Sequence, residues 1–188
     1  MTLPWPRRFD TTRLRPIAAA GLEAHTSPHT GPRTEALITA CRLGTGPASR
    51  HWATPGGPVR IEMPFCCYQV SDGESARRAC LALDGSWRMA KASAGGRWAM
   101  RAAALWADVA WWRTQQAHDA WDAGEAPNAA ALTGFEPRRT TLIVIEGTPN
   151  QSDLRALAEL ERRAHAWPRA VRVLLVGAPP GTARFLPS

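Results

Sequence analysis

Three carboxylates lie where the chain could perform acid–base or metal chemistry. Glu146 directly follows the apolar run 142–145, Asp72 follows a second apolar stretch, and Asp153 lies at the expected start of a helix. A carboxylate at the carboxyl end of a buried strand is a common metal ligand. Glu146 with Asp72 or Asp153 therefore defines one alternative, a metal-dependent nuclease, provided that the two strands are neighbours. Turn and helix-capping roles explain the same residues, and we favour that interpretation.

Sequence motifs for a cofactor or a metal are missing. The four cysteines contain no C-x-x-C pair, so a structural zinc site is not expected. The short glycine turns do not match G-x-x-x-x-G-K-[ST], and Lys91 is the only lysine. We therefore expect no bound cofactor or metal, and we interpret the chain as non-enzymatic. Cys66 and Cys67 fall within a strand and are expected to be buried.

Arginine dominates the charge of the chain. The formal net charge is +7, the isoelectric point is about 10.5, and all but one of the 23 basic residues are arginine. Arginine matches phosphate geometry, so nucleic acid, DNA or RNA, is the leading partner. Codon bias alone explains such a composition too, which leaves a purely structural interaction module as an alternative. The candidate phosphate contacts are three adjacent pairs: Arg7 and Arg8, Arg77 and Arg78, Arg138 and Arg139.

A tryptophan-rich segment is the second candidate interaction site. The pattern predicts one long helix over 97–123, which holds five of the nine tryptophans. A single stripe cannot contain them all, so this helix is either buried nearly all round or presents aromatic surface to a partner. Trp106, Trp111 and Trp112 are the candidate residues for contact with a protein partner or another copy of the chain.

The remaining elements predict the fold class. Apolar runs at 141–145 and 171–176, separated by a helical pattern over 153–167, form a βαβ unit. A helix is expected at 32–43, a strand at 59–70, a helix over 73–83, and a short strand or loop at 87–92. We expect an α/β fold with a small mixed or parallel sheet flanked by helices. Residues 1–31 are expected to form an irregular basic arm, and 32–188 a single domain.

Residues 141–177 resemble part of the STAND-type P-loop ATPases. The matching stretches are the apolar strand that ends at Glu146, the helix that begins at Asp153, and the strand 171–176. In that family they correspond to the Walker B strand, the helix after it and the sensor strand. The phosphate-binding loop has no counterpart in this chain. The resemblance therefore implies at most a degenerate, non-hydrolysing NTPase-like domain.

The sequence carries no targeting or membrane signal. Residues 1–15 are basic and proline-rich, but no apolar segment of sufficient length follows them. The longest apolar stretch, 99–112, is too short to cross a bilayer. We expect a cytoplasmic bacterial protein without a membrane partner. The leading hypothesis is a nucleic-acid-associated subunit of a larger assembly, which binds phosphate through arginine and a neighbouring protein through its tryptophan-rich helix.

Overall fold

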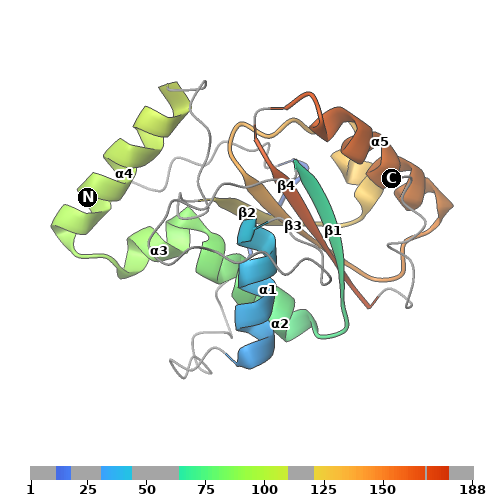
Figure 1. Cartoon of the computed structure of the whole chain (residues 1–188), viewed down its shortest axis with the longest axis horizontal. Helices are drawn as coiled ribbons and strands as arrows, with labels where there is room; N and C mark the ends of the chain where they lie inside the picture. The colour runs from blue at the N-terminus through green and yellow to red at the C-terminus, as the bar shows by residue number, and fades with distance from the viewer. Residues whose placement is uncertain (1–11, 18–30, 44–63, 110–120, 168, 178–188) are drawn as a thin grey trace.

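The computed structural model describes residues 12–17, 31–43, 64–109, 121–167 and 169–177 (Figure 1). They form an α/β fold with one four-stranded sheet, five α-helices and a short 3-10 helix, η2. The elements in chain order are α1 Pro32–Leu43, β1 Phe65–Val70, α2 Gly73–Leu83, α3 Gly85–Lys91, α4 Ala94–Val109, β2 Asp122–Ala126, η2 Ala129–Leu132, β3 Thr141–Glu146, α5 Gln151–Ala164 and β4 Val171–Val176.

The sheet is parallel throughout, with strand order β1-β4-β3-β2. β3, α5 and β4 form the expected βαβ unit, and the two strands pair in register from Thr141 opposite Val171 to Glu146 opposite Val176. Both strands are buried over their first five residues. Continuous apolar runs are typical of such strands because helices cover both faces of a parallel sheet.

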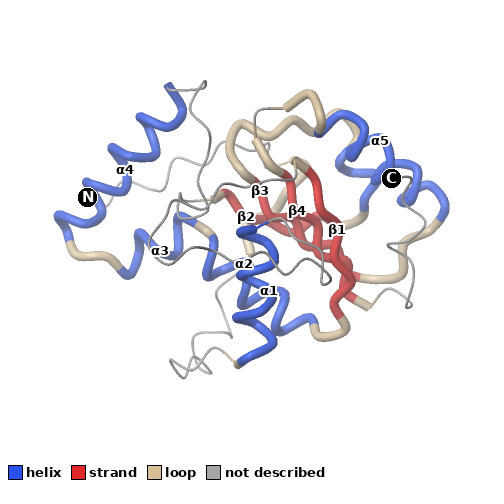
Figure 2. Tube along the Cα trace, viewed as in Figure 1, coloured by secondary structure: helices blue, strands red, loops and turns tan. Residues whose placement is uncertain are grey.

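Helices lie on both faces of the sheet (Figure 2). On one face, Ile143 and Val173 pack with Leu157 and Leu160 of α5. On the other face, Leu142 and Leu174 belong to a separate core cluster that includes side chains of α1 and α2. Because successive residues of a strand point to opposite faces, one apolar run supplies both layers. α3 and α4 extend away from this three-layer body (Figure 1).

The predicted long helix is wrong at its carboxyl end. Asp122–Ala126 is the edge strand β2, paired with β3, and Trp121 just before it is completely buried. The described part of the helix, α4, runs from Ala94 to Val109, and residues 110–120 lie outside the described ranges. Segment 87–92, expected as a strand or a loop, falls mostly within α3. The predicted strand is confirmed over 65–70, whereas 59–63 is not described.

Part of the amino-terminal arm is fixed to the sheet. Arg15 and Glu125 exchange two backbone hydrogen bonds of 2.8 Å, which places residues 12–17 antiparallel to the outer edge of β2. Leu14 is fully buried in the core beneath α5, and the Arg13 side chain donates to the carbonyl of Thr133. The rest of the predicted arm, 1–11 and 18–30, lies outside the described residues. Residues 12–17 therefore cover a sheet edge that would otherwise expose unpaired backbone groups.

Candidate functional site

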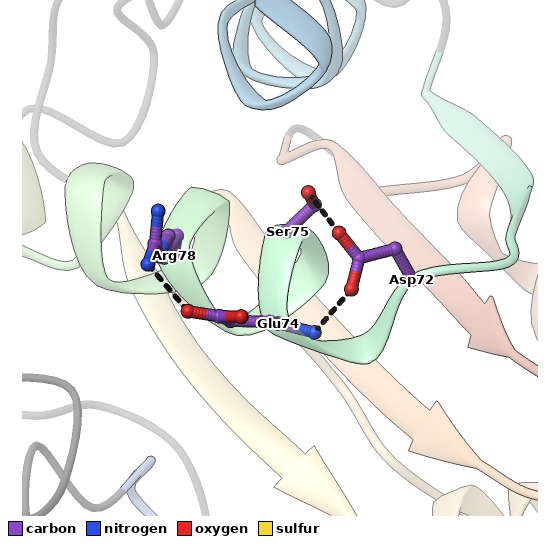
Figure 3. A network of polar contacts seen from close by, with 4 residues as sticks. All are labelled: Asp72, Glu74, Ser75 and Arg78. Carbon is purple, nitrogen blue, oxygen red and sulfur yellow. Dashed lines mark hydrogen bonds and ion pairs between the residues drawn. The ribbon is translucent and has the colours of Figure 1, made fainter. Parts of the chain in front are cut away.

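The three candidate carboxylates do not form one cluster. β4 lies between β1 and β3, so the strands that precede Asp72 and Glu146 are not neighbours. The Asp72 carboxylate caps α2: it accepts from the amide of Glu74 at 3.0 Å and from the hydroxyl of Ser75 at 2.5 Å (Figure 3). The Ser75 hydroxyl, with the backbone amides, holds the pKa of Asp72 below its ordinary value.

Asp153 is a structural residue as well. Together with Asn150 it forms a reciprocal capping box at the start of α5, with bonds of 2.9 and 3.1 Å. Its other oxygen accepts from the amide of Ala130 at 3.2 Å, which ties α5 to η2. Within the described ranges, no three His, Cys, Asp or Glu side chains are grouped to hold a metal ion.

Glu146 is exposed at the carboxyl edge of the sheet, and it is ion-paired. Its carboxylate lies 2.8 Å from the guanidinium of Arg77 on α2, which also lies 4.0 Å from Glu125. The start of α2 approaches the same point: a Cβ on Gly73 would lie 3.2 Å from Val176 and 3.7 Å from the Glu146 carboxylate. Glu146 therefore occupies the space in front of α2 where an anionic ligand would otherwise meet the helix.

Four of the six candidate phosphate-binding arginines lie within the described ranges, and three of them form intramolecular ion pairs. Arg77 binds Glu146, and Arg78 binds Glu74 one turn away on α2 (Figure 3). Arg139 is buried against Asp122, with 3.7 Å between Nη1 and Oδ1. Arg138 is exposed. Arg7 and Arg8 lie outside the described residues.

One basic segment was not singled out by the sequence patterns. Residues 85–107 contain four basic side chains and no acidic one. Elsewhere many of the carboxylates pair with arginine or cap a helix. The four basic residues are Arg88 and Lys91 on α3, and Arg97 and Arg101 on α4. A count of charge along the chain would have found this segment, because it is the longest basic stretch without an acid between the first and last elements of the sheet.

α4 exposes four of its larger apolar side chains. Trp98 is 68% exposed, Trp106 61%, Leu105 41% and Val109 64%. At 100° per residue these four positions span about 100° of the helix circumference, so they form one stripe. Exposed apolar patches of this kind mark interaction sites on proteins. The stripe of Trp98, Leu105, Trp106 and Val109 is called the α4 stripe below.

The opposite side of α4 attaches it to the rest of the molecule through smaller groups. Ala104 and Met100 pack with Met89 of α3. The Arg139 side chain donates to the carbonyl of Ala104 at 3.4 Å, and Arg97 donates to the carbonyl of Ala92 at the end of α3 at 3.4 Å. Thus Met100 and Ala104 face the protein, whereas the four residues of the α4 stripe face away from it.

The predicted partner-binding tryptophans are only partly described. Trp106 lies on the α4 stripe, whereas Trp111 and Trp112 lie outside the described residues. Trp121 belongs to the core on the α2 face of the sheet. Trp98 was not among the candidate contact residues, although at 68% exposed it is the most exposed large apolar residue described.

The cysteines lie in the protein interior. Cys41, Cys66 and Cys80 are buried and Cys67 is partly buried, as the strand pattern predicted for Cys66 and Cys67. Burial raises the pKa of Cys41 and of Cys67 to about 12, and that of Cys80 well above its ordinary value. A neutral thiol is a poor nucleophile, so none of these three groups is poised for covalent catalysis.

None of the helices in the described ranges is long and apolar enough to span a bilayer. No protein-family model, curated protein or solved structure matches the chain.

Proposed function

We propose that this chain is a non-enzymatic, basic subunit of a larger bacterial assembly, which contacts nucleic-acid phosphate and docks a neighbouring protein through α4. The observation that carries the proposal is the α4 stripe, because a helix that turns its large apolar side chains outward gains free energy only when a partner covers them. The basic segment 85–107 overlaps the stripe in sequence and supplies the attraction for an anionic partner.

The charge layout supports a nucleic-acid partner. Arg77, Arg78 and Arg139 are engaged by carboxylates of the chain, and the proposed phosphate contacts include the basic residues of α3 and α4, because residues 85–107 contain no acid. Arg138 remains part of the proposal as an exposed residue. Contacts of this kind are independent of base sequence and weaken as salt is added.

Loss of charge at two sites tests the phosphate contact. The double variant Arg88→Gln with Lys91→Gln removes two charges from α3. It should weaken binding of a labelled oligonucleotide at low salt, measured by fluorescence anisotropy, and reduce the salt slope by roughly 1 to 2. The matched control is Arg162→Gln, because Arg162 is exposed on α5 but paired with Glu159 at 2.6 Å. Equal weakening by the control would show that net charge matters and the α3 surface does not.

A degenerate NTPase-like domain is a second candidate, favoured by one specific observation. Glu146 ends β3 within a parallel sheet, and the turn from β1 into α2 occupies the place of a phosphate-binding loop. That turn contains only Ser71 and Asp72 before α2 begins, and it offers no lysine. This candidate therefore predicts that ATP with magnesium leaves the melting temperature unchanged. A rise in Tm with nucleotide would instead indicate a working nucleotide site.

The nuclease alternative rests on Glu146 as a metal ligand. The Arg77 guanidinium beside it competes with a metal ion for the same carboxylate. The test is cleavage of labelled DNA and RNA in the presence of magnesium or manganese, for the unmodified chain and for Glu146→Gln. Metal-dependent cleavage that Glu146→Gln abolishes would establish the nuclease and contradict the non-enzymatic proposal.

A further inference from the structure

We infer that the amino-terminal half of α4 binds single-stranded nucleic acid, with a base stacked on the indole of Trp98 and phosphates on the adjacent basic side chains of the same helix. This inference rests on the proposed function, since it names the form of nucleic acid that the same basic surface would take.

The two halves of α4 differ in charge. Arg97 and Arg101 lie on either side of Trp98 in the sequence, whereas residues 102–109 contain no basic residue and one acid, Asp108. A polyanion is therefore attracted to the amino-terminal half. The carboxyl-terminal half, with Leu105 and Val109 exposed, suits an apolar protein surface instead.

The Trp98 ring is accessible because most of its neighbours on the helix are small. Residues three and four positions away are adjacent on a helix surface, and around Trp98 three of these four are small, Ala94, Gly95 and Ala102, while the fourth is Arg101. A Cβ built on Gly95 would find no atom within 4 Å, so the surface beside the ring is open. With 68% of the side chain exposed, the indole can accept a stacked base without rearrangement of the helix.

Further basic groups lie on α3, which packs against the side of α4 opposite Trp98. Packing of Met89 against Met100 and Ala104 holds α3 next to α4, as Figure 1 shows. The Lys91 ammonium lies 4.2 Å from the ring centre of Trp87, which positions it at the end of α3. The basic residues nearest to Trp98 on α4 itself are Arg97, the preceding residue, and Arg101, three positions further on, so a strand on this surface would meet aromatic and cationic groups together. This combination is characteristic of proteins that bind single strands.

Single strands are favoured over a duplex because of the stacking contact. In a duplex both faces of each base are covered by the adjacent bases, so an indole cannot stack on them without cost. An unpaired base offers a free face, and each base–aromatic contact contributes substantially to affinity regardless of sequence. The basic groups alone would bind either form through its phosphates.

The experiment compares an unstructured oligothymidylate with a duplex of the same length, both fluorescein-labelled, by anisotropy at low salt. The variants are Trp98→Ala, Trp98→Phe, and Trp106→Ala as the matched control. Trp106 is a similarly exposed tryptophan of the same helix, but it lies in the half without basic residues. We expect tighter binding of the single strand, a loss of about tenfold with Trp98→Ala, and partial recovery with Trp98→Phe. We expect no change with Trp106→Ala.

The other outcomes separate this inference from the proposed function. If single strand and duplex bind with equal affinity and Trp98→Ala does not change that affinity, the stacking inference is overturned and the phosphate-binding proposal stays intact. The same loss with Trp106→Ala as with Trp98→Ala would overturn the assignment to the amino-terminal half. No binding of either oligonucleotide would overturn both. Far-UV circular dichroism of each variant confirms that the helices remain folded.

Discussion

The guanidinium of Arg139 and the carboxylate of Asp122 form a buried ion pair that connects the sheet to α4. Both side chains are almost completely inaccessible, at 5% and 1% exposed. Asp122 begins β2, and Arg139 also donates to the backbone carbonyl of Ala104 on α4. Since α4 contributes little to the main core, this contact holds the proposed interaction surface in place.

Removal of this arginine should destabilise the fold. Arg139→Ala leaves the carboxylate of Asp122 buried without its partner, and we expect a loss of about 3 to 5 kcal/mol in unfolding free energy. Urea denaturation measures the change. Its matched control is Arg138→Ala, since the adjacent Arg138 is exposed and its loss should change stability by about 0.5 kcal/mol or less. Similar effects of the two variants would refute the structural role of Arg139.

The Asp72 cap gives a prediction that depends on pH. Asp72→Ala removes the acceptor for Glu74 and Ser75 and should cost about 1 kcal/mol of stability at neutral pH. The pKa of Asp72 is lowered in the folded state, so its charge stabilises the fold above the unfolded-state pKa. That contribution is lost as pH falls through the folded pKa. The melting temperatures of the two proteins should therefore differ at neutral pH and converge in acid. A difference that stays constant with pH would contradict a contribution from the charge of Asp72.

The ion pair between Arg77 and Glu146 should contribute little to stability. Both side chains are more than one-third exposed, and such pairs contribute about 0 to 1 kcal/mol. We expect Arg77→Gln to shift the urea midpoint only slightly and the shift to shrink further at high salt. A large loss that persists in high salt would mean that Arg77 performs a packing role beyond its charge.

The thiols should react only after unfolding. Burial keeps Cys41, Cys67 and Cys80 neutral at physiological pH, and Cys66 is buried beside them. We expect the native protein to react slowly with a thiol reagent. In urea all four cysteines should become accessible and react. One cysteine that reacts rapidly in the native state would identify a reactive site that this account does not contain.

The α4 stripe predicts a change in surface properties without a loss of stability. Leu105→Ser with Val109→Ser replaces exposed apolar groups, so the urea midpoint should stay nearly constant while binding of an apolar dye such as ANS decreases. Nucleic-acid affinity should be unaffected because both residues lie in the half without basic residues. A marked drop in stability would mean that another part of the chain covers the stripe.

The sequence predicted those elements whose local pattern agrees with their tertiary role. The runs 142–145 and 171–176 are rich in β-branched and apolar residues, so β3, α5 and β4 followed from pattern alone. β2 did not, because Asp122–Ala126 consists of Asp, Ala, Gly, Glu and Ala, residues with low strand propensity. The segment is a strand because it pairs with β3 and is buried. Both interactions involve residues that are distant in the sequence, so the local pattern does not reveal them.

The missed strand also explains why part of the candidate site was misplaced. While Asp122 was assigned to a helix, nothing in the sequence could show that it neutralises Arg139. The partners of Arg77 lie at the ends of β2 and β3, far away in the sequence. Local charge patterns detect pairs on one helix, such as Glu159 and Arg162, but not pairs made by the sheet topology.

The salt dependence of nucleic-acid affinity is the measurement that tests the central claim most directly. A labelled DNA and a labelled RNA are titrated with the chain across a salt series, first without magnesium and then with it. We predict a linear fall of log affinity with log salt, whose slope counts the phosphates contacted, and no cleavage. Absence of binding at low salt would contradict the account. The +7 charge would then reflect composition, and α4 would remain as a surface for a protein partner alone.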